Sequence, residues 1–254
     1  MTDYPAAALS MYQGRLHGLS IQGVVPPQEM AAAVRRLDDL GLPRHGTIPG
    51  VDAAFSYGLM IAPTGDHPRG PDPELYLAAA GPAAAALQGL LAPPGLVPLL
   101  SRVLGLLSGL PAAVARAADG RTYLPASVRV FGDGWGAPLH CDTYMDSPTH
   151  AHLHQVTDRS TQLSWYLPMS LPEQGGELRI YDARHGEPGL VGDDMAALAA
   201  RPHVTVPLST GDMVLFDAGR WFHQIMPARG PTPRRTLGGF AALSADHRGL
   251  LFWS

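Results

Sequence analysis

Short segments with β-strand composition fill the second half of the chain, and they limit the fold more than any other feature of the sequence. Residues 127–131, Ser-Val-Arg-Val-Phe, alternate polar and apolar side chains, as a half-buried strand does. Similar segments follow, separated by Gly, Pro and Asp, at residues 162–167, 177–181, 203–208, 213–216 and 235–243. Many short strands at fairly even spacing predict a β-sandwich or a jelly roll.

The first 120 residues are instead rich in Ala, Leu and Pro. A helix is predicted from Pro26 to Gly41, because prolines and an early acid favour a helix start and apolar residues then recur at helical spacing. Two more helices are predicted at residues 73–92 and 96–118, the latter with a break at 109–111. We therefore expect a single domain (1–254) that is mainly β, with a helical N-terminal scaffold (1–120) before a jelly-roll core (121–254).

Charge and cysteine content exclude several kinds of chemistry and partner. The formal net charge is −4, which favours neither nucleic acid nor a membrane surface as a partner. The chain has no lysine, so a lysine Schiff base and a phosphate-loop lysine are both excluded. Cys141 is the single cysteine, so no intrachain disulfide can form, and a cytoplasmic location is expected. The uncharged stretch 75–101 could span a bilayer by length, but its prolines favour two helices of a globular protein.

His140 and Asp142 are spaced so that a β-strand would direct both side chains to one face and Cys141 to the other. His223, which follows a later strand and turn, supplies a third metal-binding side chain. Two imidazoles and one carboxylate form the facial triad of non-haem iron(II) oxygenases. Three protein ligands leave three metal positions open for other molecules. We therefore predict that His140, Asp142 and His223 bind Fe²⁺ and form the catalytic centre.

The context of these three residues resembles a known superfamily. Residues 130–142, 163–168, 175–181, 211–223 and 234–240 are similar, in this order, to motifs of the 2-oxoglutarate/iron(II)-dependent oxygenases, prolyl-hydroxylase-like branch. The resemblance covers residues 121–245, about half of the chain. It implies a double-stranded β-helix, the cupin-like jelly roll. It also implies an enzyme that uses dioxygen, hydroxylates a substrate and converts 2-oxoglutarate, its co-substrate, to succinate.

2-Oxoglutarate has a distal carboxylate, which a planar, bidentate arginine suits better than a point charge. The superfamily motif pairs an arginine with a hydroxyl two positions later, and Arg234 with Thr236 fits this on one strand face. Arg235 would point to the opposite face. Tyr166 aligns with a tyrosine that contacts the same carboxylate in some prolyl-hydroxylase-like members. We therefore predict that Arg234, Thr236 and Tyr166 bind the co-substrate.

The substrate is less constrained by the sequence. The residues that flank the motifs and could line a substrate pocket are Arg129, Tyr144, Trp165 and Trp221. A small metabolite, for example one derived from an amino acid, fits a short chain without docking modules, and a monomer or a homodimer is expected. The three alternating histidines His150, His152 and His154 are interpreted as part of a loop or lid, with a second zinc site as the alternative.

Two other functional classes remain open from sequence. A cupin-like metal-dependent hydrolase or isomerase could use the same His/Asp/His site, but it would not need Arg234. A jelly-roll binding module without turnover would not need all three ligands. Halogenating relatives of the superfamily replace the carboxylate ligand with Gly or Ala. Asp142 therefore disfavours halogenation, whereas desaturation, epoxidation and ring closure stay open.

Overall fold

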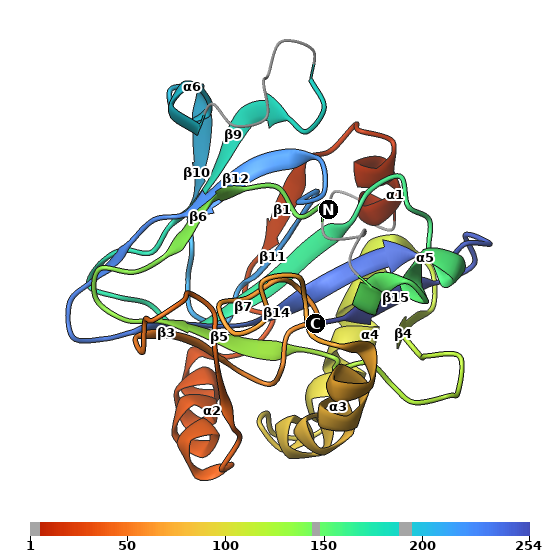
Figure 1. The fold of residues 1–254 in the computed structure, drawn as a ribbon, viewed down its shortest axis with the longest axis horizontal. Helices are drawn as coiled ribbons and strands as arrows, with labels where there is room; N and C mark the ends of the chain where they lie inside the picture. Colours follow the sequence, from red (N-terminus) through yellow and green to blue (C-terminus); the bar gives the residue numbers. More distant parts are fainter. Residues whose placement is uncertain (1–5, 144–147, 188–194) are drawn as a thin grey trace.

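Two facing β-sheets form the centre of the computed structural model, which describes residues 6–143, 148–187 and 195–254 (Figure 1). The larger sheet has the strand order β1-β11-β7-β14-β5-β3-β2, and β15 joins it by pairing with β14 and with β4. The smaller sheet has the order β10-β9-β12-β6. Neighbouring strands in the smaller sheet are antiparallel, as expected for a jelly roll. The predicted jelly-roll core is therefore confirmed.

The strands of the larger sheet are β1 (Gly18–Ile21), β2 (Arg44–Gly46), β3 (Ala54–Tyr57), β4 (Ala112–Val114), β5 (Ser127–Phe131), β7 (Leu163–Ser170), β11 (Met213–Phe216), β14 (Arg234–Leu243) and β15 (Leu250–Trp253). Those of the smaller sheet are β6 (Ala137–His140), β9 (Leu178–Arg184), β10 (His203–Val206) and β12 (Trp221–Ile225). A separate short pair consists of β8 (Gln174–Gly175) and β13 (Ala228–Arg229). The helices are α1 (Ala7–Tyr12), α2 (Pro27–Asp39), α3 (Pro73–Gln88), α4 (Leu96–Ser108), η2 (Pro148–His150), α5 (Leu153–Val156) and α6 (Met195–Ala199).

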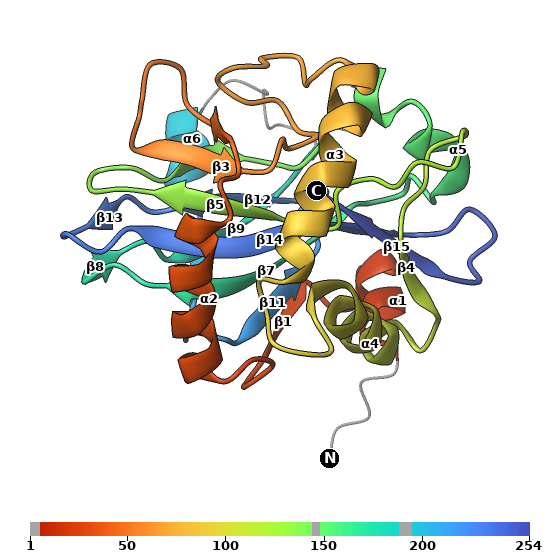
Figure 2. The same cartoon turned by 90° about the horizontal axis from the view of Figure 1, so that it is seen from below.

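Helices α2 and α3 lie on the outer face of the larger sheet, opposite the smaller sheet (Figures 1 and 2). Helix α2 turns a buried stripe of Met30, Ala33 and Leu37 toward the sheet, and it contacts β7. These side chains belong to a large apolar core that the helices share with β5, β7 and β14. The helices therefore support the sheet from behind and leave its inner face free.

The predicted helices exist, and their ends have local causes. Proline occupies the first turn of α2, as predicted, and Asp72 caps α3 by accepting hydrogen bonds from the backbone of Glu74 and Leu75. Helix α4 ends at Ser108 rather than continuing to residue 118, because Gly109 adopts a left-handed conformation (φ 68°). The chain then enters β4, which pairs with β15.

The predicted helical N-terminal half is not confirmed, because β1, β2, β3 and β4 also lie within the first 120 residues. Strand β1 pairs with β11, and β3 pairs with β5. These strands have three or four residues each, too few for a clear alternation pattern. Their conformation is set by pairing with the edges of a sheet that is built mainly from the second half of the chain.

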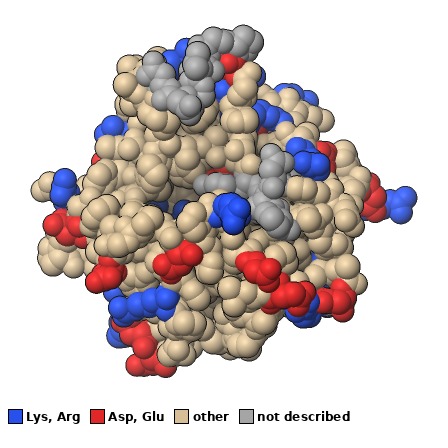
Figure 3. All heavy atoms as spheres, in the orientation of Figure 1, with Lys and Arg blue, Asp and Glu red and all other residues tan. Residues whose placement is uncertain are grey.

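No helix in residues 6–143, 148–187 and 195–254 has the length and the apolar composition that a bilayer-spanning segment needs. The uncharged stretch 75–101 instead contains most of α3 and the start of α4. Acidic and basic side chains both occur on the face shown in Figure 3, and no broad basic patch is visible there.

Candidate active site

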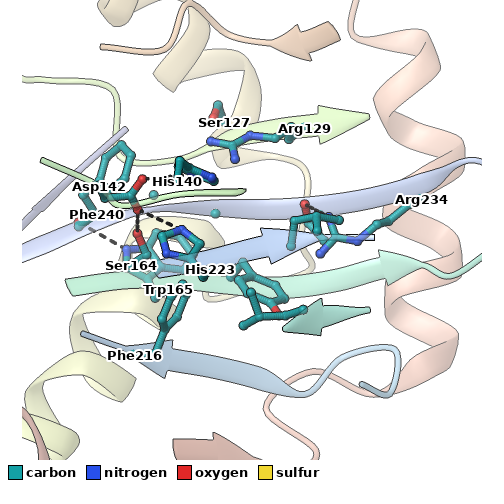
Figure 4. A pocket seen from close by; sticks show the side chains of 16 residues that line it. Ser127, Arg129, His140, Asp142, Ser164, Trp165, Phe216, His223, Arg234 and Phe240 are labelled. Atoms are coloured by element: carbon teal, nitrogen blue, oxygen red, sulfur yellow. Dashed lines mark hydrogen bonds and ion pairs between the residues drawn. The ribbon is translucent and has the colours of Figure 1, made fainter. Parts of the chain in front are cut away.

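His140, Asp142 and His223 meet between the two sheets (Figure 4). His140 is the last residue of β6, Asp142 follows two residues later, and His223 lies in β12 directly opposite His140. Their ligand atoms all lie within 4.8 Å of one another. The Nε2 atom of His140 is 3.4 Å from Oδ1 of Asp142, and that of His223 is 3.8 Å from Oδ2. This separation lets one ion contact all three side chains.

Backbone contacts orient both imidazoles. The Nδ1 atom of His140 is 2.6 Å from the carbonyl oxygen of Pro138, and that of His223 is 3.0 Å from the carbonyl oxygen of Trp221. A carbonyl oxygen can only accept a hydrogen bond, so each Nδ1 carries a proton. Each Nε2, which lies on the side of Asp142, then keeps a lone pair that can bind a metal, and this is the tautomer that a metal ligand needs.

Asp142 is held in place from two sides. Its backbone N–H donates to the carbonyl oxygen of Ala218 (2.8 Å), and the Ser164 hydroxyl donates to its Oδ2. Burial opposes ionisation of Asp142, but the nearby imidazoles of His223 and His140 and the hydrogen bond from Ser164 outweigh it, so the pKa of this carboxyl lies below its usual value. Burial, reinforced by His140, lowers the pKa of His223 to about 4. At neutral pH the site therefore has one negative carboxylate and a neutral His223.

Cys141 does not join this group. Its side chain is buried, and its thiol donates to the carbonyl oxygen of Ala218 at 3.2 Å. His150 and the segment after it form η2 and α5. Among the residues that the structure describes, His140, Asp142 and His223 are the one group of three or more side chains with metal-binding geometry. The alternative of a second zinc site at the three alternating histidines therefore has no support.

Arg234 lies at the far end of the pocket that the three metal-type ligands line (Figure 4). It is 2% exposed, its Nε donates to the carbonyl oxygen of Gly176 (2.8 Å), and its Nη1 donates to Thr236 Oγ1 (3.2 Å). Gly176 allows this approach, because its φ is 73° and a Cβ there would lie 3.2 Å from Cδ of Arg234. The glycine at position 176 thus leaves room for the Arg234 side chain.

The Arg234 guanidinium is a buried cation without an acidic partner among the described residues. Burial lowers its pKa to about 10, so it stays charged at neutral pH. Tyr166 lies beside it, with 5.5 Å between the guanidinium carbon and the ring centre, and the Tyr166 hydroxyl has no hydrogen-bond partner in the described part of the chain. A buried unpaired charge is costly, so this end of the pocket is built for an anion.

The neighbouring Arg235 lies on the opposite face of β14, because side chains alternate along a strand. It is half-buried and does not line the pocket, whereas Arg234 and Thr236 both do. The strand register that we predicted for Arg234 therefore agrees with the structure. The role of Arg234, Thr236 and Tyr166 toward 2-oxoglutarate stays a prediction.

The four predicted substrate residues have different positions. Arg129 lines the pocket, and Trp165 also contributes to its wall, although its indole is buried and donates to the carbonyl oxygen of Phe240 (3.3 Å). Trp221 faces another cavity and stacks against Arg184, 4.6 Å from the guanidinium carbon to the ring centre. Tyr144 lies outside the described residues.

Sequence reasoning missed Ser164, which contacts Asp142, and Phe216, whose ring meets His223 edge-on with centres 4.9 Å apart. A signal for Ser164 existed. It lies two residues before Tyr166 on one strand, so the two side chains must share a face. Phe216 offered no comparable signal, because an apolar residue in a buried strand usually belongs to the core.

The whole chain, residues 1–254, matches the family model of the carrier-protein-independent halogenase WelO5. A comparison with curated proteins gave no match. A solved structure of an N-substituted L-amino acid dioxygenase from Burkholderia ambifaria AMMD is similar, with 18% identity and a TM-score of 0.62 over 98% of this chain and 90% of that one.

Two more solved structures share the fold. A 2OG-Fe(II) oxygenase family protein from Burkholderia pseudomallei has 15% identity and a TM-score of 0.52 over 96% of this chain and 92% of that one. The non-heme alpha ketoglutarate dependent epimerase SnoN, from nogalamycin biosynthesis, has 14% identity and a TM-score of 0.53 over 92% and 84%. The chain therefore belongs to the family of the carrier-protein-independent halogenase WelO5, within the 2-oxoglutarate/iron(II)-dependent oxygenase superfamily.

Proposed function

We propose that this protein is an oxygenase that hydroxylates a small metabolite, with Fe²⁺ held by His140, Asp142 and His223. The observation that carries the proposal is the buried, unpaired Arg234 in the same pocket as these three side chains. A metal hydrolase or isomerase with the same triad has no use for such a cation. An oxygenase needs it, because 2-oxoglutarate must be held at its distal carboxylate while its other end reaches the metal.

The donor set fits iron(II). Two Nε2 atoms and one carboxylate converge, the rings are already in the correct tautomer, and the three residues leave metal positions open on the pocket side. When bound, iron(II) and 2-oxoglutarate supply the oxidising chemistry, with dioxygen consumed and succinate and carbon dioxide released. Arg234 and Thr236 would bind the distal carboxylate, and the free Tyr166 hydroxyl would donate a further hydrogen bond to it.

Asp142 favours hydroxylation over the halogenation for which the family is named. A halide would need the coordination position that this carboxylate takes. Asp142 is 4% exposed, ionised and fixed by Ser164 and the Ala218 carbonyl, so moving it aside would break several contacts. A second anion at that position would also be repelled by the carboxylate. One of the solved structures with a similar fold is an epimerase. Oxidative reactions other than hydroxylation are therefore alternatives, and a product assay must distinguish them.

The test is a product assay with a panel of small metabolites, iron(II), 2-oxoglutarate and dioxygen in a buffer that contains chloride. We expect succinate to form together with a product that is heavier by one oxygen atom, which mass spectrometry detects. A chlorinated product would refute the role given to Asp142. Without succinate formation, a product of unchanged mass would favour the isomerase alternative, and products that together are heavier by one water would favour the hydrolase alternative.

A further inference from the structure

Arg129 is a second cation near the metal-type ligands. It lies in β5, directly opposite Thr236 of β14, and its side chain lines the same pocket. Among the described residues it forms no hydrogen bond, ion pair or ring contact. In Figure 4 its guanidinium extends toward His140, whereas that of Arg234 lies farther along the pocket. Within the described part of the chain, Arg129 is therefore a positive charge without a counterion beside the metal site.

A second cavity begins at the same point. It has a volume of about 180 Å³ and shares Arg129 and His140 with the first pocket. The segment 47–64 forms one side of it, and β5 and β6 form the other. Its apolar wall consists of Ile48, Met60, Ala62, Pro63, Phe131 and Ala137. Thr47 also lines this cavity, and its buried hydroxyl has no hydrogen-bond partner among the described residues. The cavity thus combines an apolar wall with one cation and one free hydroxyl.

Charge balance, on the proposed function, assigns these groups to a substrate. Iron(II) and Arg234 carry three positive charges, and Asp142 with the 2-oxoglutarate dianion carries three negative ones. Both carboxylates of 2-oxoglutarate then already have a cation, namely the metal and Arg234. The charge of Arg129 is left without a counterpart in a half-buried position, where an unpaired charge is unfavourable. The missing group is one further anion.

We propose that the substrate is an apolar carboxylic acid, whose carboxylate pairs with Arg129 and whose apolar body fills the cavity between residues 47–64 and β6. This inference rests on the proposed function and adds the substrate class to it. The arrangement places carbon atoms near the carboxylate beside His140, and hence close to the metal. The Thr47 hydroxyl would donate to, or accept from, a polar substituent on the apolar body.

The experiment compares two probes of equal shape, 4-methylpentanoate and 4-methylpentanamide, which differ in charge. Each is titrated anaerobically into protein with saturating iron(II) and 2-oxoglutarate, and broadening of the probe's proton signals by paramagnetic iron measures binding near the metal. We expect the acid to bind roughly tenfold to a hundredfold more tightly than the amide, the range of a charge-assisted hydrogen-bonded pair. Arg129→Gln should remove this preference, and Arg129→Lys should restore part of it.

Arg235→Gln is the matched control, because Arg235 lies on the opposite face of β14, and it should leave the preference unchanged. The Arg129→Gln variant should still show the visible charge-transfer band of bound 2-oxoglutarate. The 2-oxoglutarate affinity measured from this band should lie within a few-fold of the wild-type value. Equal binding of acid and amide, or binding of neither, overturns the proposal. Loss of 2-oxoglutarate affinity by more than about tenfold in Arg129→Gln also overturns it, because Arg129 would then bind the co-substrate. Absence of the band in the wild type would instead refute the proposed function.

Discussion

Replacing Arg234 with alanine should weaken 2-oxoglutarate binding by about two to three orders of magnitude. Arg234 is 2% exposed, and its guanidinium is charged at neutral pH and fixed by Gly176 and Thr236, so it is ready for a carboxylate before the co-substrate arrives. A carboxylate that enters this pocket loses water. Removal of its partner then costs roughly 3–5 kcal/mol, at about 1.4 kcal/mol per tenfold change in affinity.

The assay is an anaerobic titration of 2-oxoglutarate with iron(II) in excess, and thermal unfolding gives a second readout. At a hundredfold excess over its dissociation constant, 2-oxoglutarate should stabilise the wild type by about 2.7 kcal/mol, whereas the same concentration should barely change Arg234→Ala. Arg234→Lys should recover part of the affinity, since an ammonium cannot reproduce the planar fork. Arg235→Ala serves as the control and should stay within a few-fold of wild type. A large loss in Arg235→Ala and a small one in Arg234→Ala would refute the reasoning.

Further predictions concern the metal site. His223→Ala should abolish stoichiometric iron uptake, measured by metal analysis, while His203→Ala on the exposed edge strand β10 should retain it; retention in both would refute the ligand assignment. Asp142→Gly should abolish oxygen insertion, and normal hydroxylation in this variant would contradict the role of the carboxylate. Ser164→Ala should weaken iron binding by about tenfold to a hundredfold, the usual effect of removing a hydrogen bond to a metal ligand. Unchanged iron affinity would show that the Ser164 hydroxyl is dispensable. Burial lowers the pKa of Arg234 only to about 10, so Arg234 stays charged between about pH 7 and 9. The affinity for 2-oxoglutarate should therefore be nearly constant over this range, and a steep decline would count against an arginine anchor.

The sequence predicted best those elements whose pattern is local. Strand β5 has the predicted limits, 127–131, because polar and apolar residues alternate along it and turn residues follow. A strand was predicted at His140 and Asp142, but β6 spans Ala137–His140 and so ends before Asp142; its start was not predicted, because it has four residues and contains Pro138. Proline is accepted there because β6 is an edge strand of the smaller sheet.

The candidate site was partly predictable for the same reason. Arg234 and Thr236 alternate along a single strand, and Asp142 lies only two residues beyond the end of β6 at His140, so both pairs could be recognised from local sequence. Assignments that depend on how distant strands pack were less reliable. Trp221 is next but one to His223 in sequence, yet its side chain faces another cavity, where it stacks on Arg184. The cavity beside Arg129 requires segment 47–64, and nothing in that segment's own sequence places it against β6.

The central claim is that His140, Asp142, His223 and Arg234 form one site for iron(II) and 2-oxoglutarate, and anaerobic absorption spectroscopy tests it most directly. Iron(II) is added first, to one equivalent per chain, and 2-oxoglutarate is then titrated. We predict a weak visible charge-transfer band from the metal to the chelated 2-oxo acid, which saturates at one 2-oxoglutarate per chain and is absent in His223→Ala. Stoichiometric iron binding without any such band, at 2-oxoglutarate concentrations that saturate other members of the superfamily, would contradict the account.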